Sequence, residues 1–190
     1  MAVLSRIKGI LLTPQTEWDA VARDTPATSV LLRSYLLPLS LLTPLATVIG
    51  MLFFDTRWSA EYGYSILRDR APFIALTTYA FQIGSVYLLA AVLYLLARTE
   101  RRAPSFLVAL QVAVFGTIPV QLSGVFLVIP FGVVASLLAM MYAFYLYYLG
   151  AERLIGVRPA DSAMFIGVAM VCMILLSSII GGIASATGIV

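Results

Sequence analysis

The chain has 190 residues, of which 62% are hydrophobic and 11% are charged, with a net charge of +3. This composition excludes an ordinary soluble domain, in which about 45–50% of residues are apolar and about 25% are charged. Histidine is absent and the single cysteine, Cys172, lies inside an apolar segment, so the sequence offers no metal-ligand cluster, zinc motif or His-activated nucleophile. No basic run is interleaved with aromatic residues on a polar domain, which argues against nucleic-acid binding.

The segment before the membrane domain, residues 1–33, predicts two short amphipathic helices on the cytoplasmic side. In the first, apolar side chains share one helical face, and Arg6 and Lys8 flank it where they can reach lipid headgroups. Pro14 suits the first position of the second helix, and Trp18 lies on its apolar side. Two interpretations remain open, because these helices can lie in the membrane interface or pack on the bundle.

Residues 34–190 form the predicted membrane domain. Five stretches lack Asp, Glu, Lys, Arg and His. A helix needs about 20 residues to cross the hydrocarbon core, and each stretch is long enough. They are residues 35–54, 72–97, 104–123, 125–149 and 163–186. The sequence therefore predicts an all-α membrane protein, a bundle of five transmembrane helices with short amphipathic N-terminal helices.

Prolines mark expected irregularities in the spans. Pro38 and Pro44 in the first span and Pro119 in the third lack an amide donor and crowd the preceding turn, which favours a bend or local unwinding. Little chain separates the third and fourth spans. They should form a tight hairpin that turns at Gly124 or just before Pro130.

Glutamines are the sizeable polar side chains within the spans, at Gln82, Gln111 and Gln121. They suit either hydrogen bonds between helices or the lining of a pathway. All nine Asp and Glu residues lie in polar segments, which argues against proton coupling through a carboxylate within the membrane.

The last span contains two rows of small residues at four-residue spacing, on which another helix backbone can approach closely. One row is Ser177, Gly181 and Ser185, and the other is Ser178, Gly182 and Ala186. The pattern suits packing within the bundle or a homo-oligomer through this span.

The distribution of cations predicts the orientation, because Lys and Arg are retained preferentially on the cytoplasmic side. With the N-terminus inside, nine of the 12 Lys and Arg residues fall in inner segments, and only Arg57, Arg68 and Arg70 fall in an outer one. The expected topology is therefore N-terminus cytoplasmic and C-terminus outside. The inner cations that can contact headgroups or a partner are Arg6, Lys8, Arg98, Arg101, Arg102, Arg153 and Arg158.

Short motifs placed in order around the five spans resemble those of the YIP family, the Ypt-interacting membrane proteins, in its bacterial branch. They are Leu12-Thr13-Pro14 with Glu17-Trp18, Arg33-Ser34-Tyr35-Leu36-Leu37-Pro38, Phe115-Gly116-Thr117-Ile118-Pro119 with Ser123-Gly124, and Tyr145-Leu146-Tyr147-Tyr148-Leu149-Gly150 before Pro159-Ala160. The resemblance implies a five-span helical bundle. For bacterial members it implies a multi-pass inner-membrane protein.

The motifs of eukaryotic relatives are incomplete in this chain. Of their Asp-Leu-Tyr-Gly-Pro motif only Tyr35 and Pro38 can be aligned, and Gly116 is followed by Thr117 where they have a Gly-Tyr pair. The binding of small prenylated GTPases that the resemblance implies for eukaryotic members therefore does not transfer to these residues.

Two functions are compatible with these features. The first is a non-enzymatic scaffold or adaptor without a cofactor, which binds a protein partner or anionic lipid on its cytoplasmic face. The second is a passive transporter, channel or lipid-handling protein with a pathway between the proline-bent helices. A continuous polar cavity at mid-membrane would favour transport, and a dry core would favour the scaffold.

Overall fold

The computed structural model describes residues 3–24, 26–53, 71–99, 104–128 and 132–186, and side chains in all of these except 51–53 and 181–186. All regular structure in these ranges is helical. Five helical stretches are long and apolar enough to cross a membrane: Thr28–Gly50, Ala71–Thr99, Phe106–Val128, Gly132–Ile155 and Pro159–Ile180. The predicted all-α bundle is confirmed.

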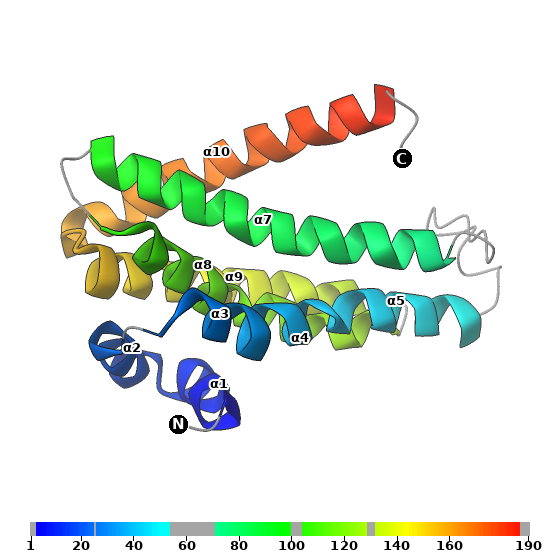
Figure 1. Ribbon diagram of the computed structural model, residues 1–190, viewed down its shortest axis with the longest axis horizontal. Coiled ribbons are helices and arrows are strands. Elements are labelled where there is room, and N and C mark those ends of the chain that lie inside the picture. The colour runs from blue at the N-terminus through cyan, green and yellow to red at the C-terminus, as the bar shows by residue number, and fades with distance from the viewer. Residues whose placement is uncertain (1–2, 25, 54–70, 100–103, 129–131, 187–190) are drawn as a thin grey trace.

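Two short helices precede the first span, as the sequence predicts. Helix α1 (Val3–Leu12) is followed at once by α2 (Pro14–Arg23), and Pro14 stands at the start of α2, where its missing N–H costs nothing. Thr13 lies at the N-cap, but its hydroxyl donates to the Gly9 carbonyl oxygen instead of capping α2. The two helices lie together against one end of the bundle, which we call the capped end (Figure 1).

The first span is assembled from short pieces: α3 (Thr28–Leu31), the π-helix η1 (Leu32–Leu36), α4 (Leu37–Ser40) and α5 (Leu42–Phe53). The π-helix ends just before Pro38, and a turn at Leu41 precedes Pro44. Both irregularities fall where the missing amide hydrogens predict them. The span starts at Thr28 rather than at residue 35, because Arg33 lies within the helical path with its side chain exposed.

The third and fourth spans form the predicted hairpin. Helix α8 (Phe106–Ser123) continues beyond Gly124 as the 3-10 helix η3 (Gly124–Val128), and α9 begins only at Gly132 (Gly132–Gly150). The third span therefore extends to Val128, and the fourth span begins at Gly132 and not at residue 125 as predicted; residues 129–131, which contain Pro130, lie outside the described residues. Gly124 serves packing instead, because a Cβ there would overlap Thr43.

Pro119 does not interrupt α8, which remains α-helical from end to end. Local unwinding is therefore not found at this proline, and the alternative expectation of a bend stays a prediction. At the start of α8, the Ser105 hydroxyl accepts a hydrogen bond from the Val108 amide at 3.3 Å and caps the helix.

Helices α7 (Ala71–Thr99) and α10 (Pro159–Ala186) lie on the same side of the bundle, and α10 diverges from α7 toward the C-terminus (Figure 1). After α9, the π-helix η4 (Ala151–Ile155) is followed by Gly156, whose φ of 78° is easily reached only by glycine. Helix α10 then starts at Pro159 rather than at residue 163.

The core is centred on α8. Twelve of its 18 residues are buried, and small side chains let neighbouring helices approach closely. At Gly116, for example, a Cβ would overlap the ring of Tyr147 from α9. Helix α10 contributes Phe165, Ile166 and Ala169 to the core, all from its first half.

Candidate functional site at the capped end

Trp18 anchors the N-terminal helices to the bundle. Its side chain is fully buried, lies edge-to-face against Phe115 with ring centroids 6.3 Å apart, and packs over Gly150. A Cβ at Gly150 would come within 2.9 Å of the indole ring. Because a buried tryptophan contributes a large apolar contact area, α2 is held firmly on α8 and α9.

Arg6 joins α1 to α2 through a buried charge cluster. The Arg6 side chain donates to the Asp24 carboxylate, and its Nη1 lies 2.9 Å from Glu17 Oε1 in an ion pair. Gly9 leaves room for Glu17, since a Cβ there would overlap the carboxylate. A guanidinium can be buried in this way because two carboxylates compensate its charge.

This geometry corrects the prediction that Arg6 reaches lipid headgroups. Only 6% of Arg6 is exposed, because the fold-back of α2 brings Glu17 and Asp24 against the flank of α1. Glu17 and Asp24 are seven residues apart, which is about two helical turns. This spacing was the signal in the sequence that could have shown that the two carboxylates lie on one face of the second helix.

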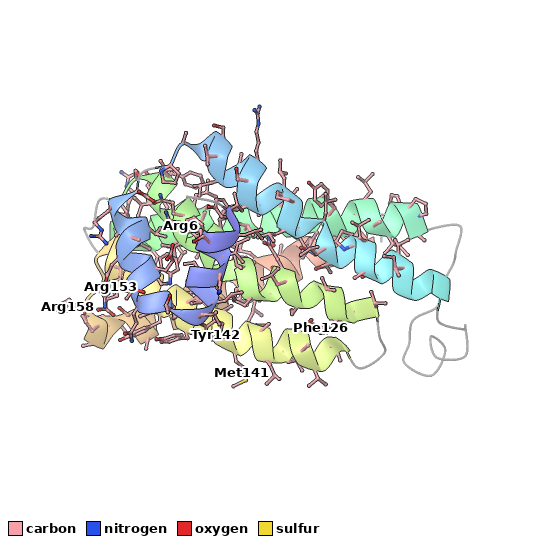
Figure 2. All side chains as sticks on the ribbon, turned by 90° about the horizontal axis from the view of Figure 1, so that it is seen from below. Arg6, Phe126, Met141, Tyr142, Arg153 and Arg158 are labelled. Carbon is pink, nitrogen blue, oxygen red and sulfur yellow. The ribbon has the colours of Figure 1, made fainter. Side chains whose placement is uncertain are left out.

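Further contacts fix the cap to the bundle. Arg153 Nη1 of η4 donates to Asp19 Oδ1 of α2 at 2.5 Å, and the Tyr142 hydroxyl of α9 donates to the Leu11 carbonyl oxygen at 2.9 Å. Figure 2 shows Arg153 and Tyr142 beside the N-terminal helices. The two helices are therefore packed on the bundle, while Leu4 and Leu12 of α1 remain mostly exposed.

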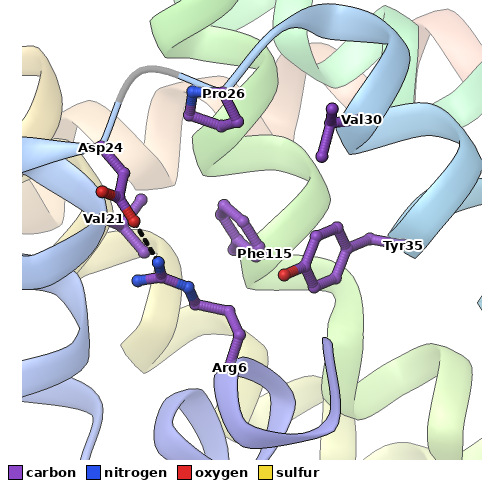
Figure 3. A pocket seen from close by; sticks show the side chains of 7 residues that line it. All are labelled: Arg6, Val21, Asp24, Pro26, Val30, Tyr35 and Phe115. Carbon is purple, nitrogen blue, oxygen red and sulfur yellow. Dashed lines mark hydrogen bonds and ion pairs between the residues drawn. The ribbon is translucent and has the colours of Figure 1, made fainter. Parts of the chain in front are cut away.

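A pocket of about 300 Å³ opens between the cap and the first span (Figure 3). Its lining comes from α1, α2, the segment before the first span, that span itself and α8, and consists of Arg6, Val21, Asp24, Pro26, Val30, Tyr35 and Phe115. Tyr35 and Phe115 meet edge-to-face with ring centroids 5.1 Å apart. The pocket thus combines a charged side with an aromatic wall.

The Yip1 domain matches residues 8–181, which is nearly the whole chain. The chain belongs to the Yip1 family. Comparison with curated proteins found no match, and comparison with solved structures found none either.

The match confirms the resemblance at the level of the family, and the structure gives several of the motif residues a physical role in this Yip1-family protein. Pro14 starts α2, Glu17 pairs with Arg6, and Trp18 anchors the cap. In the third span, Gly116 receives the Tyr147 ring, and the hydroxyls of Thr117 and Tyr147 lie 2.7 Å apart in a hydrogen bond.

The cations predicted to form a headgroup-facing set differ in their surroundings. Lys8 and Arg98 are exposed, and Arg98 Nη1 donates to the Tyr94 hydroxyl at 3.1 Å. Arg153 pairs with Asp19, and Arg158 Nε donates to Asp161 Oδ2 at 2.7 Å. Figure 2 places Arg153 and Arg158 together at the capped end. Arg101 and Arg102, like Arg57, Arg68 and Arg70, lie outside the described residues.

Two of the three glutamines bond to groups on other segments. Gln121 Nε2 donates to Ser40 Oγ of the first span at 3.0 Å, and Gln111 Nε2 donates to the Asp24 carbonyl oxygen at 3.3 Å. Each is only 3% exposed. Gln82 is half-buried on α7.

The small residues of the last span lie on the part of α10 that diverges from α7. Ser177 is half-buried, and Ser178 is exposed, with its hydroxyl bonded to the Ile174 carbonyl oxygen at 2.8 Å. The surroundings of Gly181, Gly182, Ser185 and Ala186 lie outside what the structure describes. Packing through these rows stays a prediction.

Proposed function

We propose that this Yip1-family protein is a non-enzymatic scaffold or adaptor of the bacterial inner membrane, with its N-terminus in the cytoplasm and its C-terminus outside. Its capped end would then face the cytoplasm and bind a protein partner or anionic lipid. One observation carries the proposal. The N-terminal helices are fastened to the bundle by Trp18 and by the ion pairs of Arg6 and Arg153, and so present a preformed surface.

A preformed surface favours binding because little conformational entropy is lost when a partner docks. The capped end also carries exposed cations, Lys8 on α1 and Arg98 at the end of α7 (Figure 1). Each cation near an anionic leaflet contributes on the order of 1 kcal/mol of attraction. Acidic groups on a protein partner would be attracted by the same charges.

The buried glutamines support a scaffold over a transport pathway. Gln111 and Gln121 are nearly inaccessible and bond to neighbouring segments. The pocket beside Arg6 lies at the capped end, near the start of the first span. The lack of histidine in the chain further supports a non-enzymatic role, since no His-based acid–base or nucleophilic chemistry is available.

The test replaces two exposed cations of the capped end together, as Lys8→Gln with Arg98→Gln. Topology should be unchanged, because seven inner cations still oppose three outer ones. Binding to vesicles that contain an anionic lipid, or crosslinked co-purification of a protein partner from native membranes, should weaken. The matched control removes two cations from the predicted outer loop, as Arg68→Gln with Arg70→Gln, and should leave both kinds of binding intact. Equal behaviour of the two variants would refute the role of the capped end.

The proposed orientation has its own test. A C-terminal reporter that is active only outside the cytoplasm should be active when fused after Val190. Activity of a cytoplasm-specific reporter at that position would reverse the assignment of the capped end.

A further inference from the structure

The pocket between the cap and the first span has a charge pattern that the proposed scaffold surface does not use. The charge cluster beside it contains one cation, Arg6, and two carboxylates, Glu17 and Asp24, so its formal charge is −1; of these three residues, Arg6 and Asp24 line the pocket. Both terminal nitrogens of Arg6 already face carboxylates. The Asp24 side chain is 51% exposed, and its carboxylate retains free acceptor capacity. A cation therefore complements this pocket better than an anion.

The aromatic wall indicates the kind of cation. Tyr35 and Phe115, residues that are 7% and 2% exposed, line the pocket with their rings. Aromatic faces attract ammonium groups, and this attraction strengthens where the cation is partly desolvated. Figure 3 shows the two rings beside the Arg6–Asp24 pair, so an ammonium could lie between a carboxylate acceptor and an aromatic surface.

The position of the pocket favours a lipid as the source of this ammonium. Val30 belongs to the first turns of the first span, and Tyr35 lies seven residues after the start of the span at Thr28, about 10 Å along a helix. If the first span crosses the membrane from Thr28 onward, this part of the helix would lie near the boundary between headgroups and hydrocarbon. Farther along the same span, Leu41, Leu45 and Ile49 are exposed.

The size of the pocket fits one headgroup. Its volume of about 300 Å³ lies at the lower end of the roughly 300–1,000 Å³ that small-molecule sites occupy. The acyl chains of a bound lipid would have to remain outside the pocket. There, the exposed side chains of the first span offer an apolar surface. Arg33 is exposed and lies three residues beyond Val30, within the π-helix η1.

We propose that the pocket binds the headgroup of a phospholipid with a primary ammonium, such as phosphatidylethanolamine. The ammonium donates to the Asp24 carboxylate and lies against Tyr35 and Phe115. The lipid phosphate pairs with Arg33, and the acyl chains follow the exposed face of the first span. This site is distinct from the exposed cations of the proposed scaffold surface, so either proposal can fail alone.

The test measures lipid binding to the purified full-length chain by native mass spectrometry. Phosphatidylethanolamine, phosphatidylglycerol and phosphatidylcholine are compared at equal concentration and with the same acyl chains. The wild type should bind phosphatidylethanolamine most tightly and phosphatidylglycerol most weakly. Asp24→Asn should weaken phosphatidylethanolamine binding by about tenfold, the loss expected for one charge-assisted hydrogen bond.

The chain offers a closely matched control. Asp19 also belongs to α2, its side chain is 48% exposed, and it pairs with one arginine, Arg153, away from the pocket. Asp19→Asn should keep the lipid preference. A second variant, Val30→Trp, places a larger side chain in the pocket without removing an ion pair and should also weaken the preference for phosphatidylethanolamine.

Two results would overturn the proposal. One is equal binding of the three lipids by the wild type, which would also be found if the pocket instead received a lysine side chain of a protein partner. The other is an equal loss in Asp24→Asn and Asp19→Asn. If Asp24→Asn does not fold, the decision rests on Val30→Trp. The proposal would then be overturned if Val30→Trp still preferred phosphatidylethanolamine as strongly as the wild type.

Discussion

The third and fifth spans show how differently two apolar helices can be used in one bundle. In the third span, 67% of the most apolar 18-residue stretch is buried, although its mean hydropathy is only 1.7. In the fifth span the corresponding stretch has a mean hydropathy of 2.6, and only 17% of it is buried. The more apolar helix is thus the more exposed one.

The more apolar helix can be the more exposed one because the solvent around a membrane helix is lipid. Lipid tails are as apolar as leucine, so hydrophobicity alone does not drive a membrane helix into the core. Close packing and hydrogen bonds between helices do, and α8 has the residues for both, including Gly116, Gln111 and Gln121. Helix α10 instead presents Ile174, Leu175 and Ile179, which suit contact with lipid.

The largest difference between the two helices should come from truncating a large side chain on each. Phe115→Ala removes a ring on α8 that contacts Trp18 and Tyr35 and is 2% exposed. Unfolding in mixed micelles should become easier by about 3–5 kcal/mol. Ile174→Ala on α10, where the side chain is 65% exposed, should change the free energy of unfolding little. Comparable losses in the two variants would show that α10 is packed as tightly as α8.

A second comparison uses one glycine from each helix. A Cβ at Gly116 of α8 would overlap the Tyr147 ring, whereas a Cβ at Gly167 of α10 would meet nothing within 4 Å. Gly116→Leu should destabilise the protein by about 1–3 kcal/mol through overpacking. Gly167→Leu should be neutral by the same unfolding measurement. A destabilising Gly167→Leu would mean that another surface covers α10 in the membrane, as a homo-oligomer would.

The smallest expected effect concerns the hydrogen bonds of the buried helix. Gln121→Leu removes the donor to Ser40 while keeping a similar volume, and it should cost about 0.6 kcal/mol, the average measured for hydrogen bonds between membrane helices, and at most about 1.7 kcal/mol. Gln82→Leu on α7, where the side chain is half-buried, is the control. If Gln121→Leu proves stabilising, the glutamine is kept for a reason other than packing, and the pathway hypothesis regains support.

The sequence predicts the helices well because length and hydropathy decide them. All five spans are found, and Pro38 and Pro44 mark the irregularities of the first one. The predicted span boundaries were wrong wherever a helix was assumed to end at the nearest charged residue. The spans that begin at Thr28 and Pro159 include Arg33 and Asp161, since a long or terminal charged side chain can reach the membrane surface.

The candidate site was harder to predict because it depends on contacts between distant segments. Trp18 and Arg6 can be recognised as members of amphipathic helices, but their burial depends on the fold-back of α2 onto the bundle. The contacts of Arg153 with Asp19 and of Tyr142 with Leu11 join residues more than 130 positions apart. Periodicity within one helix contains no information about such pairs.

Photo-crosslinking in native membranes tests the binding role of the capped end most directly. Benzoylphenylalanine is placed either at Gln15, which is exposed on α2, or at Phe126, which is 53% exposed in η3 near the opposite end. Figure 2 shows Phe126 on the hairpin side, away from Arg153 and Arg158. The scaffold proposal predicts discrete adducts with a protein partner or anionic lipid from Gln15 and not from Phe126. The same adducts at equal yield from both positions, or adducts from Phe126 alone, would contradict it.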